Sequence, residues 1–445
     1  MKKFREYEPN QGMLMPVYLG DWVPAGHEIH VIGALLDQLD LSKIEGAYPG
    51  GGQPAYHPRM MVKILFYAYR LGVRSSRQIE RMLYENIPMR VLSGNQQPDH
   101  WTVNQFRRRH QEALGELFRQ TVSLAMKAGL VDLKHVAGDG TKLKANASKH
   151  NAMSYRRMEE AERRISEEID AYFKEADAVD EAEDREMGDR SGYELPPHLR
   201  DARKRLEVIR KAKAELEAEA KVAEVARQTK LKKEGRKPRK DPEAARPKAQ
   251  AQRNFTDPDS RVMKRSRDFI QGYNGQVAVD ATHQIIVAAD LTNLAPDAPH
   301  LPKMVDQVRE NCGRDPDEMS FDAGYYSREN LELLRTRHVE AFIPPERISH
   351  MHWRTSDPPR GRIPKSLDEK GRMMRKLRTK RGKARYRLRE TTVEPVIGQI
   401  TWNRNLRQLP RRGLQAAKTA WLFECALHNL LKIAGAIRAG TALPA

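Results

Sequence analysis

Two long helical patterns separate a single strand pattern from a later run of strands, and this feature constrains the fold most. Apolar residues recur three or four apart over 158–176 and again over 199–223. The second series alternates these spacings throughout, as a heptad seam does, with Lys213 as its charged member. We therefore predict an antiparallel, coiled-coil-like helical hairpin at 153–227, inserted into another domain. The pairing could hold within one chain or between two protomers.

The strand patterns on both sides of the hairpin predict one α/β domain made from residues 131–152 and 254–445. The strand at 134–139 is expected to end at Asp139-Gly140. A last helix is expected over 414–433, with an apolar stripe that belongs to the core. The other predicted elements are strands at 274–279, 284–291, 318–322 and 339–343 and helices at 301–311 and 327–336.

Residues 1–130 predict a helical domain. An apolar helix over 60–71 ends at Gly72, and a capping box at Ser75 opens a short helix. A second capping box, at 102–105, is expected to open a long helix whose first turns carry Arg107, Arg108 and Arg109. Short helix, glycine turn and short helix resemble a helix-turn-helix unit, and an ordinary helical bundle is the alternative. We take the three arginines as candidate DNA contacts.

The charge of the chain indicates a polyanionic partner. Its 445 residues include 79 Lys and Arg against 60 Asp and Glu, a net charge of +19. Two stretches concentrate the basic residues. Residues 228–253 predict a basic flexible linker, and 360–389, with 14 Lys and Arg against 2 acids, predict a loop because of their Gly and Pro. The first helical arm is acidic over 159–189, so we do not expect it to lie along DNA.

Other features of the sequence limit the class of protein and the compartment in which it works. The sequence has no run of about 18 apolar residues, which argues against a membrane span. Cys312 and Cys425 stand far apart, which argues against a disulfide framework or a zinc finger and fits a reducing cytoplasm. No secretory signal and no phosphate-binding glycine loop is recognisable.

Three acidic residues are candidates for chemistry. Asp139 and Asp322 each end a predicted strand beside glycine or other small residues, and Glu394 follows the basic stretch. An aspartate before glycine is most often a turn residue, so each position alone is a weak indication. Small residues next to a carboxylate also permit close approach of a ligand.

Together these positions resemble the DDE transposases of bacterial insertion sequences, in the branch with a Tyr-Arg-Glu-Lys signature. The resemblance covers about 20–150 and 255–435. The matching stretches are Asp139-Gly140-Thr141-Lys142 with Ala145-Asn146-Ala147-Ser148, Gly272-Tyr273-Asn274-Gly275-Gln276, Asp322-Ala323-Gly324-Tyr325 and Val393-Glu394-Pro395-Val396-Ile397-Gly398.

The resemblance implies a ribonuclease-H-like catalytic domain, interrupted by the helical hairpin and preceded by the all-α domain. It implies that Asp139, Asp322 and Glu394 are the catalytic residues and hold Mg²⁺, or Mn²⁺ in its place, as two ions. It also implies that Tyr386 and Arg389 contact DNA. The expected partners are double-stranded DNA, at the element ends and at the target, and a second copy of the chain, with the protein in the bacterial cytoplasm at the nucleoid.

The sequence departs from the family signature in two places. Four residues separate Arg389 from Glu394 where the signature has three, and Thr401 stands where the signature has lysine. Arg404 or Arg407 could replace that lysine, and Glu390 is the rival for the third acid. The expected activity is metal-dependent DNA cleavage at the element ends and strand transfer into target DNA. The alternatives are a catalytically inactive DNA-binding protein and a nuclease of the same fold without strand transfer.

Overall fold

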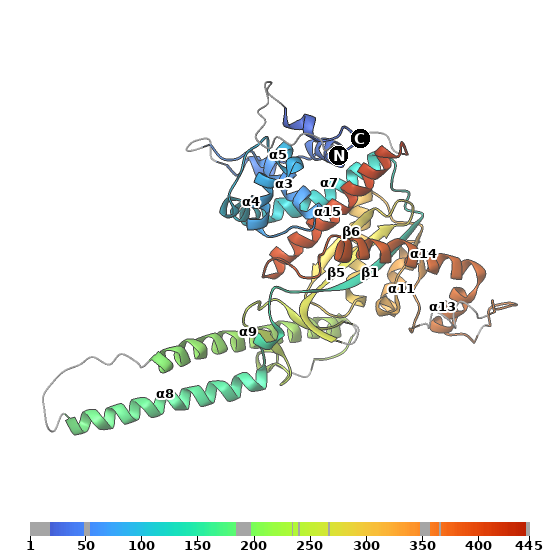
Figure 1. Cartoon of the computed structure of the whole chain (residues 1–445). Coiled ribbons are helices and arrows are strands. Elements are labelled where there is room, and N and C mark those ends of the chain that lie inside the picture. The colour runs from blue at the N-terminus through green and yellow to red at the C-terminus, as the bar shows by residue number, and fades with distance from the viewer. Residues whose placement is uncertain are drawn as a thin grey trace, which may run out of the picture.

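A helical N-terminal part, a sheet with helices around it and a pair of long helices make up the protein (Figure 1). The computed structural model describes residues 18–48, 54–183, 197–233, 235–238, 241–265, 268–347, 357–364 and 366–441. The helix α15 (Leu414–Arg438) packs on both the N-terminal helices and the sheet. These two parts therefore share one hydrophobic core.

The N-terminal part is built from short helices. Pro58 begins the third of them, at a position that needs no amide donor, and Gly72 follows its end with a φ of 74°. The predicted helix at 60–71 is therefore confirmed. Phe66 packs on Phe423 of α15, with ring centroids 4.1 Å apart. The elements are η1 (Leu19–Trp22), α1 (Glu28–Asp37), α2 (Ser42–Glu45), α3 (Pro58–Arg70), α4 (Ser76–Glu85), α5 (Ile87–Leu92), α6 (His100–Arg109) and α7 (Gln111–Lys127).

Both predicted capping boxes in this part are wrong in detail. Ser75 precedes α4, but its side chain makes no capping hydrogen bond. The second helix begins earlier than expected, because Asp99 accepts a hydrogen bond from the Thr102 N–H at 2.7 Å and is its N-cap. The predicted long helix is then interrupted at His110, which separates α6 from α7. The arginines at 107–109 therefore lie in the last turn of α6, not in the first turns of a long helix.

The sheet combines parallel and antiparallel strands, so the fold is mixed α/β. Its order is β4-β5-β1-β7-β8, and β6 also pairs with β5. β1 runs antiparallel to β5 and parallel to β7. The predicted strands after the long helices are confirmed. The strands are β1 (His135–Lys144), β4 (Arg261–Arg265), β5 (Asp268–Asp280), β6 (Ile286–Thr292), β7 (Glu318–Ser320) and β8 (Glu340–Phe342).

β1 continues to Lys144, so the prediction that this strand ends at Asp139-Gly140 is wrong. Gly140 pairs with Gln276 and Lys144 pairs with Gly272 along β5. The glycines beside Asp139 allow close packing rather than a turn. A Cβ on Gly138 would overlap the Phe321 ring, and a Cβ on Gly140 would lie 2.6 Å from the Gln276 Nε2.

The long helices α8 (Tyr155–Glu183) and α9 (Pro197–Lys233) lie side by side and extend away from the sheet (Figure 1). The two arms predicted from the apolar spacing are therefore helical. Of the connector predicted around Gly188, Gly192, Pro196 and Pro197, the first three residues lie outside the described residues, and Pro197 begins α9. Lys213, the charged member of the seam, pairs with Glu162 of α8 at 2.9 Å. The helices share a core of Tyr155, Met158, Ile165, Leu206, Ile209, Ala212 and Leu216.

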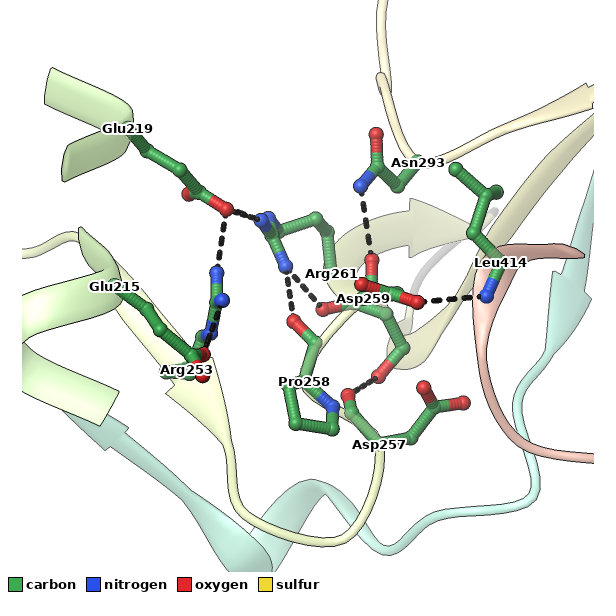
Figure 2. A network of polar contacts seen from close by, with 10 residues as sticks. Glu215, Glu219, Arg253, Asp257, Pro258, Asp259, Arg261, Asn293 and Leu414 are labelled. Carbon is green, nitrogen blue, oxygen red and sulfur yellow. Dashed lines mark hydrogen bonds and ion pairs between the residues drawn. The ribbon is translucent and has the colours of Figure 1, made fainter. Parts of the chain in front are cut away.

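The expected basic linker at 228–253 is largely ordered in its described part. It contains the end of α9, the turn η3 (Pro242–Ala244) and the start of β3 (Gln252–Asn254), which pairs with β2 (Ala152–Ser154). At least one of its arginines is engaged within the protein and does not face a polyanion. Arg253 is buried and is bound by Glu215 and Glu219 of α9 (Figure 2).

The same polar network joins the base of α9 to the sheet and to α15. Glu219 also pairs with Arg261 of β4 at 2.9 Å. Nearby, Asp259 accepts a hydrogen bond from the Leu414 N–H at 2.8 Å and from the Asn293 side chain at 3.0 Å (Figure 2). Glu219 therefore anchors α9 on the sheet through its ion pair with Arg261.

The basic stretch at 360–389 is mostly helical, so the predicted loop is wrong. It contributes to α13 (Glu369–Arg378) and to α14 (Lys380–Gly398). Side chains cap both helices: Asp368 accepts from the Gly371 N–H at 2.8 Å, and Thr379 accepts from the Gly382 N–H at 2.9 Å. Lysine and arginine are good helix formers, and the caps supply the missing start signals.

The remaining elements complete the layers around the sheet. The predicted helices at 301–311 and 327–336 are confirmed as α10 (Leu301–Cys312) and α11 (Arg328–Thr336), and the predicted C-terminal helix is α15. None of the helices in the described part of the chain is long and apolar enough to cross a bilayer. Short turns occur at η2 (Lys149–Asn151), η4 (Ala298–His300) and η5 (Ala323–Tyr325), and a π-helical turn, η6 (Gln399–Asn403), follows α14.

Candidate functional site

The pairing of β1 with β7 brings Asp139 and Asp322 together. In this parallel pair Val136 lies opposite Met319, and Ala137 lies opposite Ser320. Asp139 lies two residues after Ala137, and Asp322 lies two residues after Ser320. Side chains two residues apart on a strand point to the same face. Because neighbouring strands are about 4.8 Å apart, the two carboxylates lie side by side on one face at the end of β7.

A glycine N–H holds each of these carboxylates. Asp139 accepts a hydrogen bond from the Gly140 N–H at 2.8 Å, and Asp322 accepts one from the Gly324 N–H at 2.9 Å. Asp322 thereby caps the turn η5. Each aspartate is therefore held in its orientation by one backbone hydrogen bond.

The helix α14 packs across this face and contributes a cation and a third acid. Arg389 pairs with Asp139 at 2.6 Å and with Glu394 at 3.3 Å. The Arg389 side chain is 12% exposed and the Glu394 side chain 47%. Tyr386, one turn earlier, is hydrogen-bonded to Arg389. The structure therefore brings the five predicted site residues on β1, the end of β7 and α14 to one place.

The charges of this site are strongly coupled. Burial and, to a smaller extent, the neighbouring Asp322 raise the pKa of Asp139 to about 6, against the opposing effect of Arg389. Burial also raises the pKa of Asp322, Arg389 opposes this effect, and Asp297 adds to it. Burial disfavours the charged form of Arg389, but Asp139, Tyr386 and Glu394 outweigh it and raise the pKa of Arg389. The guanidinium therefore stays protonated between the acids.

The donor chemistry of the site suits a divalent metal ion, although its present arrangement holds a different cation. Carboxylate oxygens are the ligands that Mg²⁺ prefers. Within the described ranges, no three His, Cys, Asp or Glu side chains stand close enough together to hold an ion as they are. Instead, Asp139 and Glu394 share the Arg389 guanidinium. A metal ion would have to compete with this arginine for the Asp139 carboxylate.

A fourth carboxylate next to the site, Asp297, has no part in the sequence prediction. It lies in the loop after β6 and accepts hydrogen bonds from the side chains of Lys142, Asn274 and Gln276 at 2.8–3.0 Å. Its three partners come from β1 and β5, which are distant from it in the sequence. The polar residues at alternate positions of a predicted strand, Asn274 and Gln276, are the one signal that could have indicated a polar site there.

The arginines predicted to bind DNA at α6 have different environments. Arg107 is buried and donates hydrogen bonds to the Arg74 carbonyl at 2.7 Å and the Tyr69 hydroxyl at 3.4 Å. Arg108 is exposed. Arg109 is exposed as well and stacks on the Tyr48 ring, 4.7 Å from its centroid. Arg107 therefore holds the N-terminal helices together, whereas Arg108 and Arg109 face solvent.

The two candidate replacements for the missing lysine also differ. Arg404 is buried and pairs with Glu424 of α15 at 3.3 Å. Arg407 is exposed and stacks on Trp402, which is 61% exposed, with 4.1 Å to the ring centroid. Thr401 donates its hydroxyl to the Ile397 carbonyl. Of these residues, Arg407 is the one that presents a cation at the surface.

Comparison with known protein families gives two matches. Residues 17–109 match the family model described as a transposase domain of the type DUF772. Residues 243–430 match the model of the transposase DDE domain. The second match includes Asp322 and Glu394, whereas Asp139 lies outside both matches. No curated protein and no solved structure matches the chain.

Proposed function

Because the chain belongs to the DDE transposases of insertion sequences, we propose that it cleaves DNA at the ends of its element and joins them to target DNA. The observation that carries this proposal is the meeting of Asp139 and Asp322 through the β1–β7 pair, with Glu394 tied to Asp139 by Arg389. These three acids are the proposed catalytic residues. The order β6-β5-β1-β7-β8, with β1 in the centre, supports a ribonuclease-H-like catalytic domain.

Asp139, Asp322 and Glu394 would hold Mg²⁺, or Mn²⁺ in its place, as two ions. When bound, the ions would activate the attacking oxygen and stabilise the leaving oxygen of an in-line displacement at phosphorus. The protein's own residues orient the reactants. The glycine N–H bonds fix the two aspartates, and Arg389 and Tyr386 would hold the DNA phosphate beside them.

Double-stranded DNA, at the element ends and at the target, is the proposed partner. The chain carries a net charge of +19, and exposed lysines and arginines line α13 and α14 next to the acids. Arg108 and Arg109 are further proposed contacts, on α6. We also propose that two copies of the chain act together, because two element ends have to be processed. The exposed cations of α13, α14 and α6 are Lys370, Arg372, Arg378, Lys380, Arg381, Arg385, Arg387, Arg108 and Arg109.

One observation favours an alternative, a DNA-binding protein without catalysis. Thr401 supplies no charge where the family signature has lysine, and its hydroxyl is engaged inside the helix. Against this alternative, Arg389 reaches both Asp139 and Glu394 although its spacing from Glu394 is longer than in the signature. The altered spacing therefore does not prevent these residues from meeting.

A cleavage assay tests the proposed function. Supercoiled DNA carrying the flanking ends of the gene's own locus is incubated with Mg²⁺ and the wild-type protein, the Asp322→Ala variant or the Asp317→Ala variant. Asp317 is a suitable control because its side chain is 61% exposed and pairs with Arg314 at the surface. We expect nicking at the ends by the wild type and the control and none by Asp322→Ala. Binding of the ends without cleavage by any of the three would instead support the inactive DNA-binding protein.

A further inference from the structure

We propose that Asp297 is a positioning residue that fixes both aspartates of the site and thereby sets their affinity for a divalent metal ion. The inference rests on the proposed function, because it assumes that Asp139 and Asp322 hold such an ion. Asp297 itself follows β6 and precedes the turn η4, on neither of the strands that carry the two aspartates.

One carboxylate oxygen of Asp297 binds donors from two strands. Its Oδ1 accepts from the Lys142 ammonium at 3.0 Å, from the Asn274 amide at 2.8 Å and from the Gln276 amide at 3.0 Å. Lys142 also donates to the Ala295 carbonyl at 2.8 Å. The loop that carries Asp297 is thus bound to β1 and β5 just beyond Asp139 in the ladder, where Lys142 lies opposite Asn274 and Gly140 lies opposite Gln276.

The same carboxylate lies against two glycines. A Cβ on Gly140 would lie 2.7 Å from the Asp297 Oδ1, and a Cβ on Gly324 would lie 3.3 Å from the Asp297 Oδ2. These are the two glycines whose N–H groups hold Asp139 and Asp322. Asp297 therefore packs against the backbone that orients each aspartate, and a side chain at Gly140 would displace it.

A further hydrogen bond links Gln276 to the turn that follows Asp322. The Gln276 side chain, held by Asp297, accepts a hydrogen bond from the hydroxyl of Tyr325, which is buried in η5. Asn330 then donates to the Tyr325 carbonyl at 2.8 Å. Asp297, Gln276 and Tyr325 thus connect β5 to the turn that Asp322 caps.

These contacts indicate that Asp297 acts through other residues. Three donors engage its Oδ1, and one of them is the Lys142 ammonium, which neutralises the carboxylate. A residue of this kind orients ligands from the second layer around an ion, where its loss typically weakens metal affinity about 10–100-fold.

The test measures Mn²⁺ binding by the full chain from the electron paramagnetic resonance signal of free Mn²⁺, together with the melting temperature. Asp297→Asn keeps the shape of the side chain and removes its charge. Asp290→Asn is the matched control, because Asp290 is also a buried carboxylate, on β6, with two lysine partners, Lys303 and Lys418. Asp322→Ala tests the underlying function.

We expect Asp297→Asn to bind Mn²⁺ about 10–100-fold more weakly than the wild type, and Asp290→Asn to bind it as the wild type does. Equal Mn²⁺ affinity in Asp297→Asn and the wild type would overturn the inference, whatever the melting temperatures. If Asp322→Ala loses Mn²⁺ binding in that case, the proposed function stands and only the inference fails. If Asp322→Ala binds Mn²⁺ as well as the wild type, the metal site and the inference both fail.

A second variant covers the case in which Asp297→Asn does not fold. Lys142→Gln removes the ion pair and leaves the amide bonds from Asn274 and Gln276 to Asp297 in place. We expect this variant to melt cooperatively and to bind Mn²⁺ more weakly than the wild type. Wild-type Mn²⁺ affinity in a folded Lys142→Gln variant would overturn the inference.

Discussion

Glu424→Ala is expected to lower the free energy of unfolding by about 3–5 kcal/mol. Glu424 is fully buried on α15 and binds two arginines, Arg74 from the N-terminal part and Arg404 after η6. Their side chains are 9% and 5% exposed. Burial already lowers the pKa of Arg404, and Glu424 opposes this effect. Without Glu424, two cations would remain buried with their charges uncompensated.

Urea unfolding followed by circular dichroism measures this effect, and Glu116→Ala is the control. Glu116 also pairs with a cation, Lys43, but both side chains are more than half exposed. Such a pair contributes about 0–1 kcal/mol. A loss below about 1 kcal/mol in Glu424→Ala would show that the N-terminal part does not depend on this ion pair for its attachment to α15.

Asp139→Asn is expected to abolish cleavage and to stabilise the metal-free protein at pH 8. The variant loses a proposed metal ligand, so no cleavage should be detected. The gain in stability follows from the pKa of Asp139, which burial raises from 3.8 to about 6. This pKa already includes the opposing effect of Arg389, which also keeps Glu394 as a partner. Ionised Asp139 therefore destabilises the folded state relative to its protonated form, by about 2–3 kcal/mol for a shift of this size. The neutral amide avoids this cost.

The stability advantage of Asp139→Asn over the wild type is expected at high pH and not at low pH. Above about pH 6 the Asp139 carboxylate is ionised in the folded and the unfolded protein, so the advantage of Asp139→Asn is complete. As the pH falls from about 6 to about 4, the folded wild type takes up the proton first, and the advantage disappears. Urea unfolding with a chelator at pH 8 and pH 4 measures this difference, and exposed Asp317→Asn should show none. A variant that is less stable than the wild type at pH 8, or that still cleaves DNA, would contradict this assignment.

The elements that could be predicted from sequence are those with local signals. The predicted strands at 274–279 and 284–291 are found as the paired strands β5 and β6, and the predicted helix at 327–336 is found as α11. Only the family resemblance predicted that Asp139 and Asp322 act together, and this required their strands to lie side by side. That pairing is the one seen between β1 and β7.

What the sequence could not provide depends on distant contacts. Gly138 and Gly140 look like turn residues, but the Phe321 ring and the side chains of Gln276 and Asp297 require them to lack a side chain. Asp297 finds its partners only after the sheet has formed. The error at α13 and α14 has another origin. Their caps, Asp368 and Thr379, are local signals, which the count of glycines and prolines outweighed in the prediction.

Joining of a precut element end tests the central proposal most directly, because it separates a transposase from a nuclease that only cuts. A labelled duplex that ends in a free 3′-hydroxyl is incubated with target plasmid, Mg²⁺ and the protein, next to a duplex with a 3′-deoxy end. We predict that the wild type transfers the label to the plasmid only from the 3′-hydroxyl end, and that Glu394→Gln transfers none. Cleavage of element ends without any joining, or joining by Glu394→Gln at the wild-type rate, would contradict the proposal.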